Sequence, residues 1–199
     1  MVAASICAAL VARGERVTAF KPAVTGLDEP PGEWPHDHEL LASITGQAPE
    51  QVAPYRFGPA VSPHYAAELA GTRIEPAALA PEAEVLVCEG VGGLMVPLTT
   101  GYLVRDLAVD LGLPLVIAAR TGLGTINHSL LTIEAARSAG LRVAGVVMTP
   151  WPDDPEPIER SNRAAVERLG GVPVSGLAPT TPDSLGRGLS GLLLALGLA

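Results

Sequence analysis

Apolar and polar positions alternate between two periodicities along the chain, and the alternation predicts its secondary structure. Short apolar runs are typical of buried strands, and longer amphipathic or alanine-rich runs are typical of helices. The predicted strands are Arg16–Phe20, Glu84–Cys88, Pro114–Ala119, Arg142–Met148 and Val172–Ser175. The predicted helices are Val2–Val11, Asp37–Thr45, Val61–Ala70, Tyr102–Leu111, Thr125–Ala139, Pro157–Leu169 and Ser184–Leu196. Helices that alternate with strands predict an α/β fold, a doubly wound and mostly parallel sheet flanked by helices. The all-apolar strand Pro114–Ala119 is expected to be buried on both faces.

Composition narrows the classes of protein that this pattern fits. The 199 residues predict one domain spanning 1–199, and an apolar fraction of 48% with 17% charged residues predicts a compact core. The net charge of −8 disfavours nucleic acid and anionic membrane surfaces as partners. No apolar run is long enough to cross a bilayer, and the first one lacks the basic start of a signal peptide, so we expect a cytoplasmic protein. Cys7 and Cys88 both lie in apolar runs and are expected to be buried, reduced thiols.

Glu89 is the strongest single candidate for chemistry. It follows the predicted strand Glu84–Cys88 and precedes a glycine-rich turn, Gly90–Gly93. Open α/β sheets bind their ligands at the carboxyl ends of strands, and glycines let backbone amides approach an anion closely. A carboxylate in this position is costly unless it is paired or bound to a metal. The alternative is a glutamate that caps a turn.

A second strand end carries a cation. Lys21 follows Arg16–Phe20 and begins a turn that continues through Thr25 and Gly26. An ammonium group there can neutralise phosphate or carboxylate oxygens, whereas the structural alternative is a solvated surface lysine. Asp37 follows a proline-rich loop and starts a predicted helix, so it is either an oxygen ligand for Mg²⁺ or the N-cap of that helix.

The segment Gly122–His128 follows an apolar strand and opens a helix. The free amides and the dipole of a helix start favour a carboxylate or a phosphate. An ordinary turn with Thr125 as its cap explains the same residues equally well. Taken singly, His64, His128 and Arg105 fit structural roles better than chemical ones.

Five phrases in this order resemble the dethiobiotin synthetase family. They are Lys21–Gly26, Asp37, Ser62–His64, Val87–Leu94 and Gly122–His128. The resemblance implies a P-loop NTPase-like fold and a homodimer that acts as an ATP- and Mg²⁺-dependent ligase in biotin biosynthesis. Its substrates would be 7,8-diaminopelargonate, CO₂ and a nucleoside triphosphate. A carbamate on the diamine is phosphorylated, and the neighbouring amine then closes a cyclic urea.

The resemblance also implies roles for matching positions. Lys21 would be catalytic and hold the carbamate, Thr25 would hydrogen-bond the same group, and Asp37 and Glu89 would hold Mg²⁺. The nucleotide phosphates would lie along Gly90, Val91 and Gly92. The distal carboxylate of the substrate would lie at the helix start formed by Gly124, Thr125, Ile126 and Asn127. The nucleotide base would lie near Thr149, Pro150, Pro179, Thr180 and Thr181.

Two departures from the family pattern affect these expectations. The family's adenine-reading asparagine is replaced by the segment Thr149–Pro152, so nucleoside triphosphates other than ATP stay open. The first strand and its phosphate-binding loop, G-x-x-x-x-G-K-[ST], would precede Val2 and are missing, and a helix without a capping residue begins the chain instead. We therefore expect a short reading of a longer gene that is inactive as written. Alternatives are a non-catalytic binding or regulatory member of the fold, and a deviant Walker A ATPase or an amidoligase relative.

Overall fold

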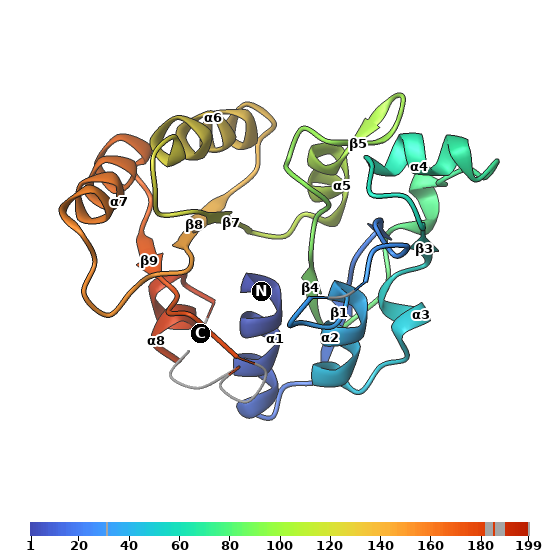
Figure 1. Ribbon diagram of the computed structural model, residues 1–199, viewed down its shortest axis with the longest axis horizontal. Coiled ribbons are helices and arrows are strands. Elements are labelled where there is room, and N and C mark those ends of the chain that lie inside the picture. Colours follow the sequence, from blue (N-terminus) through green and yellow to red (C-terminus); the bar gives the residue numbers. More distant parts are fainter. Residues whose placement is uncertain (31, 182–184, 186–189, 199) are drawn as a thin grey trace. The chain divides into compact units, whose positions relative to one another are not determined.

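The chain forms two compact units in the computed structural model, which describes residues 1–30, 32–181, 185 and 190–198 (Figure 1). Unit 1 comprises Met1 and Ala3–Leu111, and unit 2 comprises Val2 and Gly112–Ala199. Each unit is described by itself below, and a single domain over the whole chain stays a prediction.

Unit 1 contains short parallel strands and the helices that surround them. Its helices are α1 (Val2–Ala12), α2 (Asp37–Thr45), α3 (Pro49–Val52), α4 (Pro63–Leu69), the 3-10 helix η1 (Pro76–Ala78) and α5 (Val104–Leu111). Its strands are β1 (Val17–Phe20), β2 (Ala23–Val24), β3 (Tyr55–Arg56), β4 (Val85–Cys88), β5 (Pro97–Thr99) and β6 (Tyr102–Leu103). β1 pairs in parallel with β4, β2 pairs in parallel with β3, and β5 pairs antiparallel with β6.

The pairing of β1 with β4 positions the site in unit 1. Phe20 is level with Cys88 at the carboxyl ends of the two strands. The backbone amide of Glu89 donates to the Phe20 carbonyl at 2.8 Å, so the ladder continues one step beyond the strands. Lys21 and Glu89 therefore leave the sheet side by side. Buried side chains that include Phe20, Phe57 and Leu98 form a hydrophobic cluster in the core of the unit.

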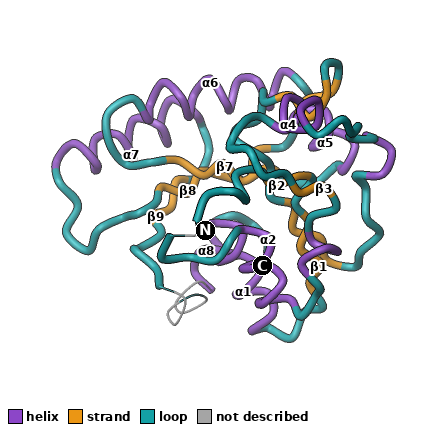
Figure 2. The backbone as a smooth tube through the Cα atoms, turned by 45° about the vertical axis from the view of Figure 1, so that its right-hand side comes forward, coloured by secondary structure: helices purple, strands orange, loops and turns teal. Residues whose placement is uncertain are grey.

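Unit 2 is a three-stranded parallel sheet with helices packed on it. Its elements are β7 (Leu115–Ala119), α6 (Thr125–Ser138), β8 (Val143–Met148), α7 (Pro157–Gly170), β9 (Val174–Gly176) and α8 (Ser190–Ala195). The strand order is β7-β8-β9, and all pairs are parallel. α6 packs against β7, β8 and α7, while α7 also packs against β9 (Figure 2). Ile133 and Val166 from these helices meet Val146 and Val174 of the sheet in the core.

The alternation of helices and strands confirms the predicted α/β class, with two differences in the sheet. The described strands form four separate sheets rather than one continuous sheet. The strand predicted over Pro114–Ala119 is not buried on both faces, because α6 covers one face while Ala118 on the other is exposed. Among the described residues, β7 has one hydrogen-bonded neighbour, β8.

The helix predicted over Tyr102–Leu111 starts later than expected. Tyr102 and Leu103 are strand residues that pair back onto β5, and α5 begins at Val104. The Asp106 carboxylate accepts a hydrogen bond from the Leu103 amide at 2.9 Å, which fixes this strand-to-helix change. Periodicity did not predict β2, β3 or α3, which are too short to show one.

The remaining expectations concern the carboxyl end, the membrane and the cysteines. The helix predicted over Ser184–Leu196 is observed in part, as α8, while residues 184 and 186–189 lie outside the described residues. No helix in the described part of the chain is both long and apolar enough to cross a membrane. Cys7 and Cys88 are free thiols; Cys7 is buried as predicted, whereas Cys88 is half-buried.

Candidate active site

Lys21 is the centre of the candidate site in unit 1. Its Nζ atom lies 2.7 Å from Glu89 Oε1 and 2.9 Å from Asp37 Oδ2, and it also approaches the Gly90 carbonyl at 3.4 Å. Lys21 is the only lysine in the 199-residue sequence, and it is only 4% exposed. Lysines are almost never buried unless they are paired, so the alternative of a solvated surface lysine is wrong.

Opposing effects decide the charge of this cluster. Burial disfavours the ammonium form of Lys21, but the carboxylates of Glu89 and Asp37 outweigh it, so the pKa of Lys21 is raised above its usual value. Burial acts against the charged form of Asp37 as well. The Lys21 ammonium outweighs that effect and keeps the pKa of the Asp37 carboxyl below its usual range. Lys21 and Asp37 therefore both stay charged at neutral pH.

Asp37 was expected to be either a Mg²⁺ ligand or the N-cap of its helix. It is not the N-cap. His36 occupies the N-cap position, and its backbone amide donates to the Glu39 carboxylate at 3.2 Å. Asp37 is the first residue of α2, and its carboxylate is directed at Lys21 instead. Its side chain is 50% exposed, whereas that of Glu89 is 21% exposed, so solvent reaches the carboxylate pair from the Asp37 side.

The donor set suits a hard cation in part. In the described residues, no group of three or more His, Cys, Asp and Glu side chains is placed to hold a metal ion. Asp37 and Glu89 supply two carboxylates that meet at a single ammonium. Mg²⁺ is typically bound in nucleotide sites by one or two carboxylates, substrate phosphates and water, so two carboxylates are the number such a site needs from the protein.

The turn after Glu89 requires two of its glycines, Gly90 and Gly92. Gly92 has φ of +71°, a left-handed conformation that other residues rarely adopt. A β-carbon on Gly90 would lie 2.9 Å from Cγ1 of Val104, which is too close. Gly90 thus presents its backbone carbonyl, with no side chain, to the Lys21 ammonium. A role for Gly90, Val91 and Gly92 in lining phosphates stays a prediction.

Thr25 lies in a loop that is held by a neighbouring turn. The Gly26 amide donates to the Pro59 carbonyl at 3.1 Å, and the Leu27 amide donates to the Phe57 carbonyl at 3.2 Å. Further along that turn, Ser62 Oγ and His64 Nδ1 are 3.0 Å apart at the start of α4. The Thr25 side chain is half-buried at the end of β2, and its substrate-binding role stays a prediction.

The helix start predicted in unit 2 is present. Gly124, with φ of +91°, is the N-cap of α6, and Thr125 is the first helical residue, so Thr125 is not the cap. No side chain caps this end of the helix. The residue that anchors the turn was not among the predicted site residues. Asn162 of α7 is 7% exposed, and its Nδ2 donates to the carbonyls of Thr121 at 2.9 Å and Gly122 at 3.3 Å.

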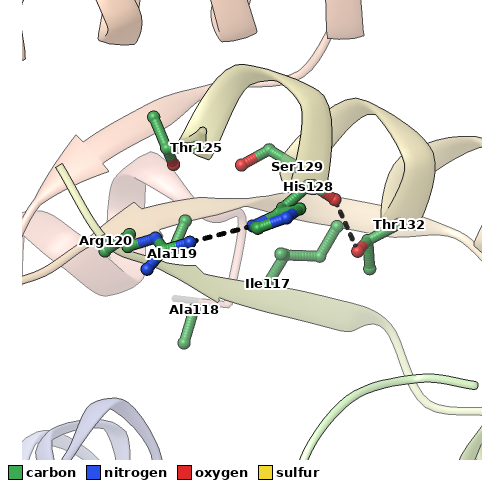
Figure 3. Close-up of a pocket in the computed structure, with 8 residues that line it drawn as sticks. All are labelled: Ile117, Ala118, Ala119, Arg120, Thr125, His128, Ser129 and Thr132. Atoms are coloured by element: carbon green, nitrogen blue, oxygen red, sulfur yellow. Dashed lines mark hydrogen bonds between the residues drawn. The ribbon is translucent and has the colours of Figure 1, made fainter. Parts of the chain in front are cut away.

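A pocket of about 300 Å³ lies beside this helix start (Figure 3). It is lined by residues 117–120 and by four side chains of α6, which are Thr125, His128, Ser129 and Thr132. The hydroxyls of Thr125 and Ser129 are buried and have no hydrogen-bond partner in the described structure. The Arg120 guanidinium lies 3.3 Å from His128 Nδ1. This pocket combines a cation, a helix N-terminus and free hydroxyls, which are all features of an anion site.

The residues expected near the nucleotide base follow the strands of unit 2. The Thr149 amide donates to the Ala119 carbonyl at 2.8 Å, and a cis peptide bond joins Thr149 to Pro150. Pro179, Thr180 and Thr181 lie on the segment after β9, where the Leu185 amide donates to the Thr181 carbonyl at 3.0 Å. Their contact with a nucleotide stays a prediction. Of the predicted site residues, the structure thus brings Lys21, Asp37 and Glu89 into direct contact.

Comparison with known proteins first defines the class of the chain. A protein family described as an AAA domain matches residues 2–186. This match and the helix-flanked parallel strands give the chain a P-loop NTPase-like α/β fold.

Individual relatives define the family. The chain is 40% identical to an ATP-dependent dethiobiotin synthetase of Anaeromyxobacter dehalogenans over 92% of this chain and 84% of that protein. It is 32% identical to the Bacillus subtilis enzyme of the same name, over 90% and 80% of the two chains. A bifunctional biotin biosynthesis protein of Bordetella avium is 41% identical over 89% of this chain, which spans 37% of that longer protein. The chain belongs to the ATP-dependent dethiobiotin synthetase family.

Proposed function

We propose that this protein is a dethiobiotin synthase, an ATP-dependent ligase of biotin biosynthesis. Its substrates would be 7,8-diaminopelargonate, CO₂ and ATP, with other nucleoside triphosphates left open. The single structural observation that carries the proposal is the only lysine of the chain, buried between Asp37 and Glu89 where two parallel strands end. A buried cation at this edge of an α/β sheet suits a reaction in which negative charge moves between carboxylate and phosphate oxygens.

The reaction has three steps. One amine of the substrate adds to CO₂, loses a proton and becomes a carbamate. A carbamate oxygen then attacks the γ-phosphorus of ATP, and ADP leaves with the bonding electron pair. The second amine attacks the carbamate carbon and loses a proton, the C–O bond to phosphate breaks, and inorganic phosphate leaves as the cyclic urea forms. No covalent bond to the protein is required, so positioning and electrostatics account for the catalysis.

Lys21 fits the demand of the first two steps. Its raised pKa keeps the side chain as an ammonium, which can hold the carbamate oxygens and offset the charge of the γ-phosphate. Burial in a site of low dielectric strengthens this interaction relative to water. Thr25, in the loop that follows β2, would hydrogen-bond the same carbamate.

The carboxylates of Asp37 and Glu89 would hold Mg²⁺, since they offer the hard oxygen donors that this ion prefers. When bound, Mg²⁺ supplies positive charge to the phosphate oxygens of the nucleotide. Without the ion, the same two carboxylates pair with Lys21 and keep its ammonium in place. The glycine turn Gly90–Gly92 would line the phosphates, while Thr149, Pro150 and Pro179–Thr181 would lie near the base.

The start of α6, Gly124–Asn127, would receive the distal carboxylate of the substrate through its free amides. By the family resemblance, this helix start acts across the interface of a homodimer. We further propose a cytoplasmic enzyme with no nucleic-acid or membrane partner, in agreement with its net charge of −8.

Turnover also needs a cradle for the nucleotide phosphates. The pattern G-x-x-x-x-G-K-[ST] does not occur in the 199 residues, because the only lysine, Lys21, follows Phe20 rather than such a glycine loop. We therefore propose that these 199 residues by themselves are inactive, and the assay should use the full-length product of the gene.

The test is to incubate that protein with 7,8-diaminopelargonate, ¹³C-bicarbonate, ATP and Mg²⁺ and to follow the products by mass spectrometry. We expect ¹³C-dethiobiotin and ADP to form in equal amounts. Binding of the diamine without any product would favour the alternative, a non-catalytic binding or regulatory member of the fold. ATP hydrolysis at a rate that does not depend on the diamine would favour the other alternative, a deviant Walker A ATPase.

A further inference from the structure

Arg120 places a positive charge where a helix already carries one. Its Nη2 atom lies 3.6 Å from the position that a β-carbon would take on Gly124, the N-cap of α6. The N-terminus of a helix carries a partial positive charge, so a cation beside it is unfavourable unless an anion offsets both. In the described part of unit 2, no carboxylate lies within ion-pair distance of Arg120.

Arg120 contacts His128, and this contact orients the guanidinium without neutralising its charge. The guanidinium donates to His128 Nδ1 at 3.3 Å, because an arginine has no acceptor. His128 lies one turn into α6, so this hydrogen bond holds the guanidinium over the helix start (Figure 3). Both residues are exposed and therefore accessible to a ligand from solvent.

Two buried hydroxyls on the same pocket are independent signs of a ligand. Thr125 is 1% exposed and Ser129 is 2% exposed, yet neither hydroxyl has a hydrogen-bond partner in the described structure. Buried polar groups nearly always have partners, so unpaired ones that line an open pocket point to a polar ligand. Unlike the bare N-terminus of a helix, this arrangement supplies side-chain donors as well as amides.

The floor of the pocket indicates which kind of anion fits. Ile117 and Ala119 of β7 line it beside the hydroxyls, and its volume is about 300 Å³. An apolar floor next to a cationic rim suits an aliphatic chain that ends in a carboxylate better than a nucleotide phosphate, which has no apolar stem.

We infer that Arg120 is the counter-ion of the substrate's terminal carboxylate and makes the enzyme select a charged aliphatic diamine over an uncharged one. The inference rests on the proposed function, in which the diamine carries such a carboxylate. The inference identifies Arg120 as the side chain that binds the negative charge. It also assigns the hydroxyls of Thr125 and Ser129 to the same ligand.

The test compares 7,8-diaminopelargonate with its methyl ester, which keeps the diamine and removes the negative charge. In Arg120→Gln we expect the KM for the acid to rise about 10- to 100-fold, the loss typical of a charge-assisted hydrogen bond. The value of kcat and the KM for ATP should stay within a few-fold. The wild-type preference for the acid over the ester should largely disappear, and Arg120→Lys should restore part of it.

Arg142→Gln is the matched control, because Arg142 is also an exposed arginine of unit 2 and lies outside the pocket. An unchanged acid-to-ester preference in Arg120→Gln would overturn the inference. A rise in the KM for ATP alone would also overturn it, since the guanidinium would then serve the nucleotide.

Calorimetric titration of the diamine into wild type and Arg120→Gln makes the same comparison without turnover. If the wild type forms no product, the proposed enzymatic function fails. The inference about Arg120 then stands if the wild type binds the acid more tightly than the ester and Arg120→Gln does not. It fails if the two proteins bind both compounds equally.

Discussion

Lys21 is buried at the edge of a sheet because two acids from different parts of the chain neutralise it. Glu89 comes from the strand beside it, and Asp37 comes from the first turn of α2. If the two acids hold Mg²⁺ as proposed, we expect the removal of either one to lower the affinity for the ion and to change the charge around the ammonium. The effects of mutating the two acids can therefore be measured separately from the effect of mutating Lys21.

For Glu89→Gln, we expect the apparent affinity for Mg²⁺ to fall by at least about tenfold, because one of two anionic donors becomes neutral. The value of kcat at saturating Mg²⁺ should fall much less. The measurement is a Mg²⁺ titration of initial rates. Glu84→Gln is the control, because Glu84 pairs with Arg16 on the exposed surface and is not part of the site. An unchanged Mg²⁺ dependence would remove Glu89 from the set of ligands.

The two cysteines should be unreactive in the folded protein. Burial, reinforced by the nearby Glu89 carboxylate, raises the pKa of the Cys7 thiol to about 12, and burial also raises that of Cys88 to about 12. Thiolates are the reactive form, so a disulfide-exchange reagent at pH 8 should label both residues slowly in the native state and rapidly in denaturant. Rapid labelling of the native protein would show that the thiols are more accessible than the structure indicates.

At the scale of elements, the start of α5 depends on one carboxylate. Asp106 accepts the Leu103 amide at the point where β6 gives way to the helix. This backbone hydrogen bond lowers the pKa of Asp106 below its usual value of 3.8, and Arg105 acts in the same direction. A group whose pKa is lower in the folded state stabilises the fold above its unfolded pKa and loses that effect as the pH falls.

Asp106→Ala should therefore destabilise the protein by about 1 kcal/mol at pH 7, the usual cost of a lost helix-capping hydrogen bond. The difference between wild type and variant should shrink as the pH falls below 3.8 towards the lower pKa of the folded state. Denaturant unfolding at several pH values measures both effects. A difference that stays constant down to pH 2 would mean that ionised Asp106 does not provide the stabilisation.

The turn that opens α6 depends on a residue from another helix. In Asn162→Leu, the carbonyls of Thr121 and Gly122 lose their donor. We expect faster hydrogen exchange at the amides of residues 122–127, because the turn is no longer held. Val166→Ala is the matched control, since Val166 is a buried residue of the same helix that leaves the turn untouched. Equal changes in the two variants would reflect general destabilisation of unit 2.

Elements with a clear periodicity could be predicted from the sequence, and elements defined by pairing could not. The runs around Val85–Cys88 and Thr125–Ser138 are long enough to show a period. Tyr102 and Leu103 look helical from composition, but their pairing with β5 makes them a strand. At the site, the positions of Lys21 and Glu89 could be predicted, because each residue follows the end of a predicted strand. The anchoring by Asn162 could not be predicted, because a buried asparagine on a polar helix resembles any surface asparagine in sequence.

At the scale of the whole molecule, the family resemblance predicts a homodimer. Leu123 is 86% exposed and Leu131 is 56% exposed near the start and middle of α6, and large exposed apolar side chains of this kind are common at interfaces. Sedimentation equilibrium should give a mass about twice the 20.4 kDa of the chain. Leu123→Glu should shift the protein towards the monomer. A wild-type protein that is monomeric at micromolar concentrations would contradict this expectation.

The central claim is that the one lysine of this chain is the catalytic cation of a ligase. The most direct test is kcat/KM for dethiobiotin formation by Lys21→Gln, prepared as the full-length product of its gene and compared with the exposed-cation control Arg16→Gln. We predict a loss of at least about 100-fold for Lys21→Gln, the usual cost of removing a group that stabilises transition-state charge, with nucleotide binding retained. The control should keep nearly wild-type activity. A loss of only a few-fold in Lys21→Gln would contradict the account.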